Sequence, residues 1–227
     1  MSVRPWSVVS FDAGGTLLEP WPSVGEVYAA GAAQAGYPGL DPATLNQRFV
    51  RAWKSSAGFD YSRAAWRGLV ADTFAGSMPD PANPDLFAEL YDRFARPGAW
   101  RVFDDVPVTL RRLRAAGYRL VVTSNWDERL RPLLTALGLV TDFELVVASS
   151  EWGWHKPDRR LFAAVADRLQ VPAGEIIHVG DSHREDVAGA EAAGWSARWL
   201  RRHHSLDDVG SGALRTLDEL LSNRVRS

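Results

Sequence analysis

The run Asp12-Ala13-Gly14-Gly15-Thr16 carries the first group in the chain that could do chemistry. Asp12 follows an apolar segment that is typical of a strand, and a glycine-rich turn comes after it. A carboxylate at the carboxyl end of a strand can act as a nucleophile toward a phosphate or a similar electrophile. Gly14 stands where a second carboxylate would supply a proton to the leaving group. The run therefore predicts a nucleophile whose partner acid is missing.

Polar side chains also follow three further apolar runs. Ser124 and Asn125 supply a hydroxyl and an amide that can hydrogen-bond a phosphoryl oxygen. Lys156 lies in the loop after the third run, just before a predicted helix. Asp181 follows the fourth run, and Asp186 comes five residues later. These groups stand in the order that a phosphoryl-transfer site needs.

The charges of these side chains explain why they belong together. Asp12, Asp181 and Asp186 in one pocket would repel one another and a phosphate dianion, so the site must contain cations. Lys156 supplies one positive charge, and a Mg²⁺ ion held by carboxylates, a backbone carbonyl and waters would supply two more. Aspartates also cap helices and form turns. The prediction therefore depends on the joint order of the motifs at successive strand ends.

Short apolar runs without alternation predict buried parallel strands, because both faces of such a strand are covered. The runs are Val8 to Phe11, Leu120 to Thr123, Leu145 to Ala148 and Ile176 to Val179, with a weaker fifth run, Ala197 to Leu200. The helices predicted between them are Val106 to Ala116, Asp127 to Leu137 and Pro157 to Leu169. This alternation predicts an α/β fold with a doubly wound parallel sheet.

The segment from Glu19 to Gly98 breaks the alternation, since its pattern predicts helices only. They are expected at Ser23 to Ala35, Pro42 to Ser55, Ser62 to Ala75 and Pro84 to Ala95. We therefore predict an α/β core from residues 1–18 and 99–227 and an all-helical cap from residues 19–98. Open α/β sheets bind ligands at the carboxyl ends of their strands. A cap there can exclude water and choose the substrate.

Composition excludes several classes of function. The chain has 227 residues, of which 46% are hydrophobic, and its net charge of -2 provides no basic field for nucleic acid or a membrane surface. Cysteine is absent and no signal peptide is visible, so we expect a cytoplasmic protein. Lys54 and Lys156 are the only lysines. The pair His203-His204 is expected in a surface loop, and nothing in the sequence predicts an oligomeric state.

The chain resembles the haloacid dehalogenase superfamily of hydrolases. The family pattern is Asp-x-Asp-Gly-Thr, a strand-terminal Ser or Thr, a Lys, and Gly-Asp with a further Asp. The resemblance covers nearly the whole chain and implies a Rossmann-like core with the helical cap of subfamily I. The insert is similar to the group called haloacid dehalogenase-like hydrolase domain-containing protein 3, or rhythmically expressed gene 2-like, through Arg51-Ala52-Trp53-Lys54 and Ala65-Trp66.

The resemblance implies a role for each candidate residue. Asp12 would be the nucleophile that forms an aspartyl-phosphate. Ser124 would bind the phosphoryl group, and Lys156 would neutralise both the nucleophile and the phosphate. Asp181 would hold the cofactor Mg²⁺, with Asp186 as a second or outer-shell acid. The substrate implied is a small phosphorylated molecule.

Gly14 departs from the family pattern. Its backbone carbonyl can still be the metal ligand of that position, but the general acid is a side chain that glycine lacks. The first hypothesis is therefore a Mg²⁺-dependent phosphatase with a weakened or relocated acid. Asp127, His155 and His183 lie in loops where they could replace it, although solvated loop side chains are expected for the two histidines.

Two other hypotheses stay open. The second is a different hydrolysis on the same scaffold. A phosphonatase would need Lys54 for a Schiff base, although an ordinary surface lysine is expected there, and dehalogenases of the superfamily lack the Gly-Asp motif and use no metal. The third is a non-catalytic phosphate-ligand binder, for which Trp126, Trp152 and Trp154 could stack on a ring. The other intact motifs favour the phosphatase and place the binder last.

Overall fold

A computed structural model describes residues 5–202 and 213–222, so the pair His203-His204 lies outside the described part. The chain divides into two compact units. We call Met1–Glu19 with Val102–Ser227 the core unit, and Pro20–Arg101 the helical unit. The idea that the inserted residues act as a cap stays a prediction. Within the described ranges, no helix combines the length and the apolar character that crossing a bilayer requires.

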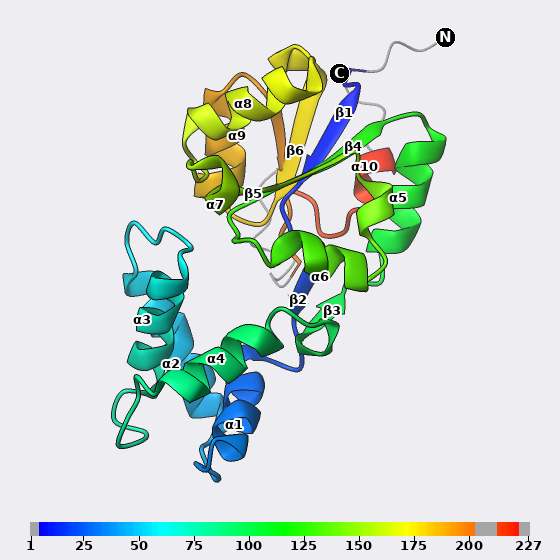
Figure 1. Ribbon diagram of the computed structural model, residues 1–227. Helices are drawn as coiled ribbons and strands as arrows, with labels where there is room; N and C mark the ends of the chain where they lie inside the picture. Colours follow the sequence, from blue (N-terminus) through cyan, green and yellow to red (C-terminus); the bar gives the residue numbers. More distant parts are fainter. Residues whose placement is uncertain (1–4, 203–212, 223–227) are drawn as a thin grey trace. The chain divides into compact units, whose positions relative to one another are not determined.

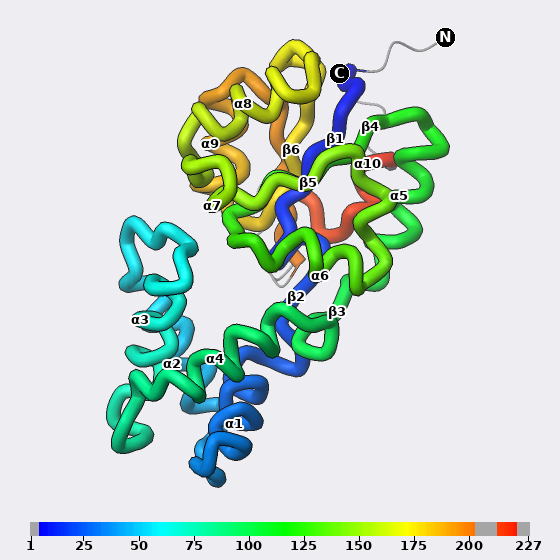
Figure 2. Tube along the Cα trace, viewed as in Figure 1, coloured from blue at the N-terminus to red at the C-terminus, as the bar shows by residue number. Residues whose placement is uncertain are grey.

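The core unit contains a five-stranded parallel sheet in the order β5-β4-β1-β6-β7. This confirms the predicted α/β fold with a parallel sheet. The central strand β1 runs between β4 and β6 (Figure 2). The bounds are β1 Val8–Phe11, β4 Arg119–Ser124, β5 Leu145–Ala148, β6 Ile176–Gly180 and β7 Ser196–Trp199.

Helices cover both faces of this sheet, which is why its inner strands are apolar without alternation. Figure 1 shows α8 (Arg159–Leu169) and α9 (Gly189–Ala192) on one side and α5 (Val106–Ala115) on the other. Leu161, Phe162 and Val165 of α8 are completely buried in one cluster with strand residues. The remaining helices of the core unit are α6 Leu130–Ala136, α7 Ser149–Trp152 and α10 Glu219–Ser222. Short 3-10 segments lie at Val140–Asp142 and Ala173–Glu175, and a π-helical turn at His183–Ala188.

The sequence-based helix at Asp127 starts three residues later in the structure, at Leu130. The reason is local: the Asp127 carboxylate accepts a hydrogen bond from the Arg129 backbone N–H, 3.1 Å away, and holds a turn before the helix. Helix α7 was not predicted, because four residues are too few to show a helical period. It ends at Trp152.

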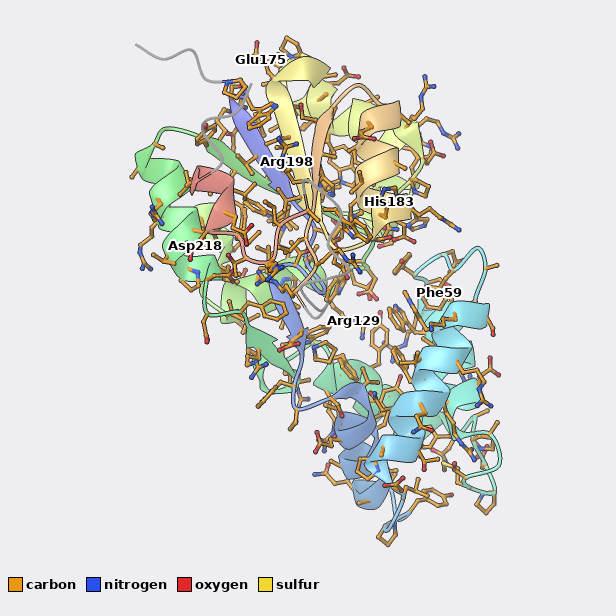
Figure 3. All side chains as sticks on the ribbon, turned by 180° about the vertical axis from the view of Figure 1, so that it is seen from behind. Phe59, Arg129, Glu175, His183, Arg198 and Asp218 are labelled. Carbon is orange, nitrogen blue, oxygen red and sulfur yellow. The ribbon has the colours of Figure 1, made fainter. Side chains whose placement is uncertain are left out.

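The helical unit consists of α1 Val24–Gln34, α2 Pro42–Ser55, α3 Arg63–Phe74 and α4 Pro84–Arg93, followed by a 3-10 turn at Pro97–Ala99. Each of these four helices begins with a side chain that accepts a hydrogen bond from the first turn, at Ser23, Asp41, Ser62 and Asn83. Their apolar faces meet in one cluster that includes Tyr28, Phe74 and Leu90. Phe59 lies in the loop between α2 and α3 (Figure 3).

The prediction that this insert holds helices only was wrong at its start, and a second strand lies just beyond its predicted end. The chain leaves the core through β2 (Leu18–Pro20) and returns through β3 (Trp100–Val102), and these strands pair with each other. Three residues give too little alternation for a sequence pattern to reveal. The pairing of β2 with β3 therefore holds the two connecting segments of the chain next to each other.

Two glycines of the helical unit should respond to alanine in opposite ways. A Cβ at Gly25 would lie 2.0 Å from the Pro42 carbonyl oxygen of α2, whereas a Cβ at Gly68 of α3 would meet no atom within 4 Å. We expect Gly25→Ala to lower the free energy of unfolding by about 1–3 kcal/mol. Gly68→Ala should raise it by about 1 kcal/mol, because alanine is the better helix former. Urea denaturation of both variants checks this, and equal stabilities would contradict the close approach of α1 and α2.

Candidate active site

The sheet order brings the predicted residues to one edge. Asp12 follows β1, Ser124 ends β4, and Asp181 follows β6, and β1 lies between the other two strands. Phe11, the last residue of β1, is level with Val122 and Val179 on its two neighbours. The carboxyl ends of parallel strands therefore emerge together, at the place where α/β sheets bind ligands.

Asp12 is almost fully buried, with 7% of its surface exposed. Its Oδ1 accepts a hydrogen bond from Ser124 Oγ at 2.8 Å and another from Lys156 Nζ at 2.7 Å. Burial raises the pKa of the Asp12 carboxyl, and the ammonium of Lys156 opposes this rise. Both hydrogen bonds use Oδ1, and within the described residues Oδ2 receives none. Oδ2 is thus the oxygen that could attack an electrophile.

Lys156 joins two carboxylates. Its Nζ lies 2.7 Å from Asp12 Oδ1 and 2.5 Å from Asp186 Oδ1, and only 3% of the residue is exposed. Burial alone would lower the pKa of the Lys156 ammonium, but the charges of Asp12 and Asp186 outweigh it and raise that pKa above its usual value. The ammonium therefore stays charged and fixed beside Asp12.

Both carboxylate oxygens of Asp186 are hydrogen-bonded to neighbouring residues. Its Oδ1 meets Lys156 Nζ and, at 3.0 Å, Nε2 of His178, while its Oδ2 accepts a hydrogen bond from the Ser182 backbone N–H at 2.9 Å. Burial would raise the pKa of the Asp186 carboxyl, but the Lys156 ammonium and the His178 hydrogen bond hold it below its usual range. A Cβ at Gly180 would lie 2.1 Å from Asp186 Cγ, so the carboxylate lies directly against the end of β6.

Of the three acids, Asp181 exposes the most surface as a whole residue, while an oxygen of its carboxyl group lies within 4.8 Å of those of the other two. Its carboxylate receives no side-chain hydrogen bond from the described part of the chain. Burial of the carboxyl group, together with the negative charges of Asp12 and Asp186, raises the pKa of Asp181 to about 7. Such a carboxylate is available to a cation that would relieve the repulsion.

The three carboxylates fit a small divalent ion. Asp12, Asp181 and Asp186 each offer an oxygen, and these oxygens lie within 4.8 Å of one another. Oxygen donors are what Mg²⁺ prefers, and the single ammonium of Lys156 does not balance three acids. Since both oxygens of Asp186 are already hydrogen-bonded, Asp12 and Asp181 are the better candidates for direct ligands. The backbone carbonyl of Gly14 stays a predicted ligand.

Asn125 is bonded to the backbone of Lys156, and its predicted contact with a phosphoryl oxygen stays a prediction. Its Oδ1 accepts a hydrogen bond from the Lys156 backbone N–H at 2.7 Å, and its Nδ2 donates to the Lys156 carbonyl at 2.9 Å. The same Nδ2 donates to Glu185 Oε2 at 3.1 Å. Both amide hydrogens are therefore used before any phosphate binds. Asn125 holds the loop that carries Lys156.

An aromatic ring lies next to the position of the missing acid. A Cβ built on Gly14 would lie 3.4 Å from Cζ3 of Trp126, a half-buried residue. Gly14 comes two residues after Asp12, which follows β1. Trp126 comes two residues after Ser124, which ends the neighbouring strand β4. The ring is thus packed beside the turn that follows the nucleophile.

The three proposed substitutes for the acid already have partners. Asp127 is buried in an ion pair with Arg129 at 2.6 Å, and Nδ1 of His155 lies 2.6 Å from Ser149 Oγ. His183 is exposed, with its ring 5.0 Å from that of Trp199; Arg129 and His183 are labelled in Figure 3. The expectation of a solvated loop histidine was wrong for His155, which is half-buried.

Sequence reasoning missed His178 and Ser10. Nδ1 of His178 lies 2.9 Å from Ser10 Oγ, and both residues are completely buried. A signal was present, because each is a polar residue inside an otherwise apolar strand, and buried polar groups need partners.

Lys54, the candidate for a Schiff base, lies exposed on α2 of the helical unit. The phosphonatase hypothesis that depends on it stays a prediction.

Comparison with known proteins agrees with the fold. The model of the haloacid dehalogenase-like hydrolase family matches residues 6–194. The chain therefore belongs to this family and is a hydrolase, as the motifs indicated. It is 37% identical to haloacid dehalogenase-like hydrolase domain-containing protein 3 of Danio rerio, with 93% of each chain covered, which confirms the resemblance to that group.

Two further relatives carry phosphatase names. The chain is 32% identical to 5-amino-6-(5-phospho-D-ribitylamino)uracil phosphatase YigB of Escherichia coli, over 86% of this chain and 83% of the relative. A crystal structure of a HAD phosphatase from Thermococcus onnurineus is similar with a TM-score of 0.69 and 26% identity, over 95% of this chain and 96% of that one.

The raised pKa of Asp181 predicts a pH dependence of stability. Its carboxyl has a pKa of about 7 in the folded protein and 3.8 as a free group, so the folded state holds the proton more tightly. Without divalent ions, this stabilisation is complete below about pH 4 and is lost as the pH rises through 7. Urea denaturation in EDTA should show a smaller loss of stability between pH 5.5 and 8 for Asp181→Asn than for the wild type. Equal losses would contradict the prediction.

Proposed function

We propose that this hydrolase is a Mg²⁺-dependent phosphatase that acts on small phosphate esters through a phosphoryl group on Asp12. The observation that carries the proposal is the arrangement of Asp12, Ser124 and Lys156. The nucleophile has one oxygen held by a hydroxyl and an ammonium, and its other oxygen receives no hydrogen bond from the described residues. The phosphatase names of relatives such as YigB support the reaction class but not a particular substrate.

The side chains present suit a two-step transfer. Oδ2 of Asp12 would attack phosphorus, and the bond to the leaving oxygen would break. Water would then attack the phosphorus of the aspartyl-phosphate, releasing inorganic phosphate and restoring the carboxylate. Ser124 would hydrogen-bond a phosphoryl oxygen, and Lys156 would offset its charge. A magnesium ion bound by Asp12 and Asp181 would neutralise further negative charge in the site.

Gly14 suggests which esters would react. A general acid contributes about 10²–10⁴-fold to such a reaction, and this chain has no side chain at that position. Aryl and acyl phosphates have leaving groups that are stable as anions, so they need no proton. We propose that substrates of this kind are hydrolysed better than alkyl phosphates.

Two further parts of the proposal concern the whole chain. The helical unit begins at β2, shortly after Asp12 in sequence, and ends at β3, which pairs with β2; this supports a role as a cap that selects the substrate. The absence of cysteine supports a cytoplasmic location.

Removing the nucleophile should abolish turnover. We expect Asp12→Asn to hydrolyse p-nitrophenyl phosphate in Mg²⁺ more slowly than the wild type by a factor on the order of 10³ or more. Chelation of Mg²⁺ should also stop the wild type. Asp72→Asn, which changes an exposed residue of α3, is the matched control and should keep full activity. Wild-type turnover no higher than that of Asp12→Asn would refute the proposed function.

Restoring the acid should favour alkyl phosphates. Gly14→Asp must share its space with the ring of Trp126, which would be 3.4 Å from the new Cβ. We therefore expect a larger gain for glycerol phosphate in Gly14→Asp combined with Trp126→Ala, up to about 10²-fold. Turnover of p-nitrophenyl phosphate should rise much less. Trp126→Ala alone is the control, and an unchanged ratio of alkyl to aryl turnover in both Gly14→Asp proteins would show that the missing acid is not limiting.

A further inference from the structure

His178 is a completely buried histidine in the middle of β6. Its Nε2 lies 3.0 Å from Asp186 Oδ1, and its Nδ1 lies 2.9 Å from Ser10 Oγ. The hydroxyl of Ser10 is in turn 3.0 Å from that of Thr123 on β4. The ring of Phe162 meets the imidazole edge-on at 5.8 Å. The imidazole is therefore held by Asp186 of the π-helical turn on one side and by Ser10 of β1 on the other, with Phe162 of α8 packed against it.

The hydrogen on Nε2 can be assigned from chemistry. Asp186 Oδ1 lies 2.5 Å from the ammonium of Lys156, and Asp186 Oδ2 accepts a hydrogen bond from the Ser182 backbone N–H, so both carboxylate oxygens act as acceptors. Nε2 must therefore carry the hydrogen and donate it to Asp186 Oδ1. That same oxygen accepts the hydrogen bond from Lys156 Nζ.

Lys156 transmits this arrangement to the nucleophile. Its Nζ contacts Asp186 and Asp12 at once, so a rotation of the Asp186 carboxylate would move the ammonium away from Asp12 or change its angle. Ser182 fixes the other oxygen of Asp186 at 2.9 Å, and His178 supplies the second restraint on Oδ1. Outer partners of this kind orient the groups that touch the substrate.

We propose that His178 is a positioning residue for the Asp12 site, acting through Asp186 and Lys156. The proposal rests on the proposed phosphatase function and adds a residue to its machinery. His178 touches neither Asp12 nor a phosphate; its N–H sets the direction in which Lys156 presents its charge.

Two variants of similar polarity separate positioning from simple filling of space. The amide nitrogen of Gln in His178→Gln can reach the place of Nε2 and donate to Asp186. The shorter side chain in His178→Asn can reach only the place of Nδ1, next to Ser10. We expect His178→Asn to lower kcat for p-nitrophenyl phosphate about 10- to 100-fold with little change in KM. His178→Gln should stay within a few-fold of the wild type.

The small number of lysines provides a readout that does not need turnover. Lys54 and Lys156 are the only lysines of the chain, so labelling with ¹³C,¹⁵N-lysine gives one side-chain NMR signal from each. We expect the Lys156 signal to shift in His178→Asn and to stay close to its wild-type position in His178→Gln. The signal of Lys54, exposed on α2, should be unchanged in both and serves as the internal control.

The outcomes separate this proposal from the proposed function. Equal Lys156 signals in the wild type and in a folded His178→Asn would overturn the positioning role, as would equal kinetic losses in the Asn and Gln variants. If no phosphate ester is hydrolysed by the wild type, the phosphatase proposal fails, and the NMR comparison still decides whether His178 orients Lys156. Should His178→Asn fail to fold, Ser10→Ala replaces it. This variant frees one side of the imidazole, and an unmoved Lys156 signal in it would overturn the proposal.

Discussion

The ammonium of Lys156, buried between Asp12 and Asp186, is the interaction on which the rest of the site depends. Three carboxylates at one sheet edge would repel one another, and burial strengthens that repulsion. One ammonium, 2.7 Å from Asp12 and 2.5 Å from Asp186, offsets part of the charge of both. The third, Asp181, remains with a raised pKa of about 7. The imbalance of one cation against three acids is what makes this edge of the sheet suited to a divalent ion.

Two features of the fold produce this charge arrangement: the order of the parallel strands and the anchoring of the loop that carries Lys156. Parallel strands deliver Asp12, Ser124 and Asp181 to one edge, but Lys156 comes from a loop, which needs its own support. Asn125 provides it with two hydrogen bonds to the Lys156 backbone, and so joins the end of β4 to that loop. The side chain of Asn125, which we predicted to bind phosphate, therefore orders Lys156, the residue that would neutralise the phosphate. Removing one partner from such a buried charge pair costs about 3–5 kcal/mol in general, so the site and the stability of the core unit are linked.

Much of this arrangement could be predicted from the sequence, because parallel strands leave a simple pattern: an apolar run, then a polar residue at its end. That pattern located Asp12, Ser124 and Asp181 correctly at one sheet edge. It could not reveal which side chains pair across long separations. Side-chain directions decide that Asn125 bonds to the Lys156 backbone and that His178 bonds to Asp186 and Ser10. The spacing of residues in the sequence does not encode those directions. The strands β2 and β3 and the helix α7 were missed for another reason, since each is too short to show a period.

The contact between Gly14 and Trp126 changes the meaning of the missing acid. If Gly14 left only an empty space, water could enter beside Asp12 and deliver a proton to the leaving group. The half-buried ring of Trp126, 3.4 Å from the place of a Cβ, occupies that side of the turn instead. The atom of the ring nearest to Gly14 is the carbon Cζ3, and a carbon edge beside a departing oxygen would disfavour negative charge there, because carbon provides little solvation. If the proposed function holds, the same two residues would both disfavour alkoxide leaving groups and favour anions that spread their charge over a ring or a carbonyl.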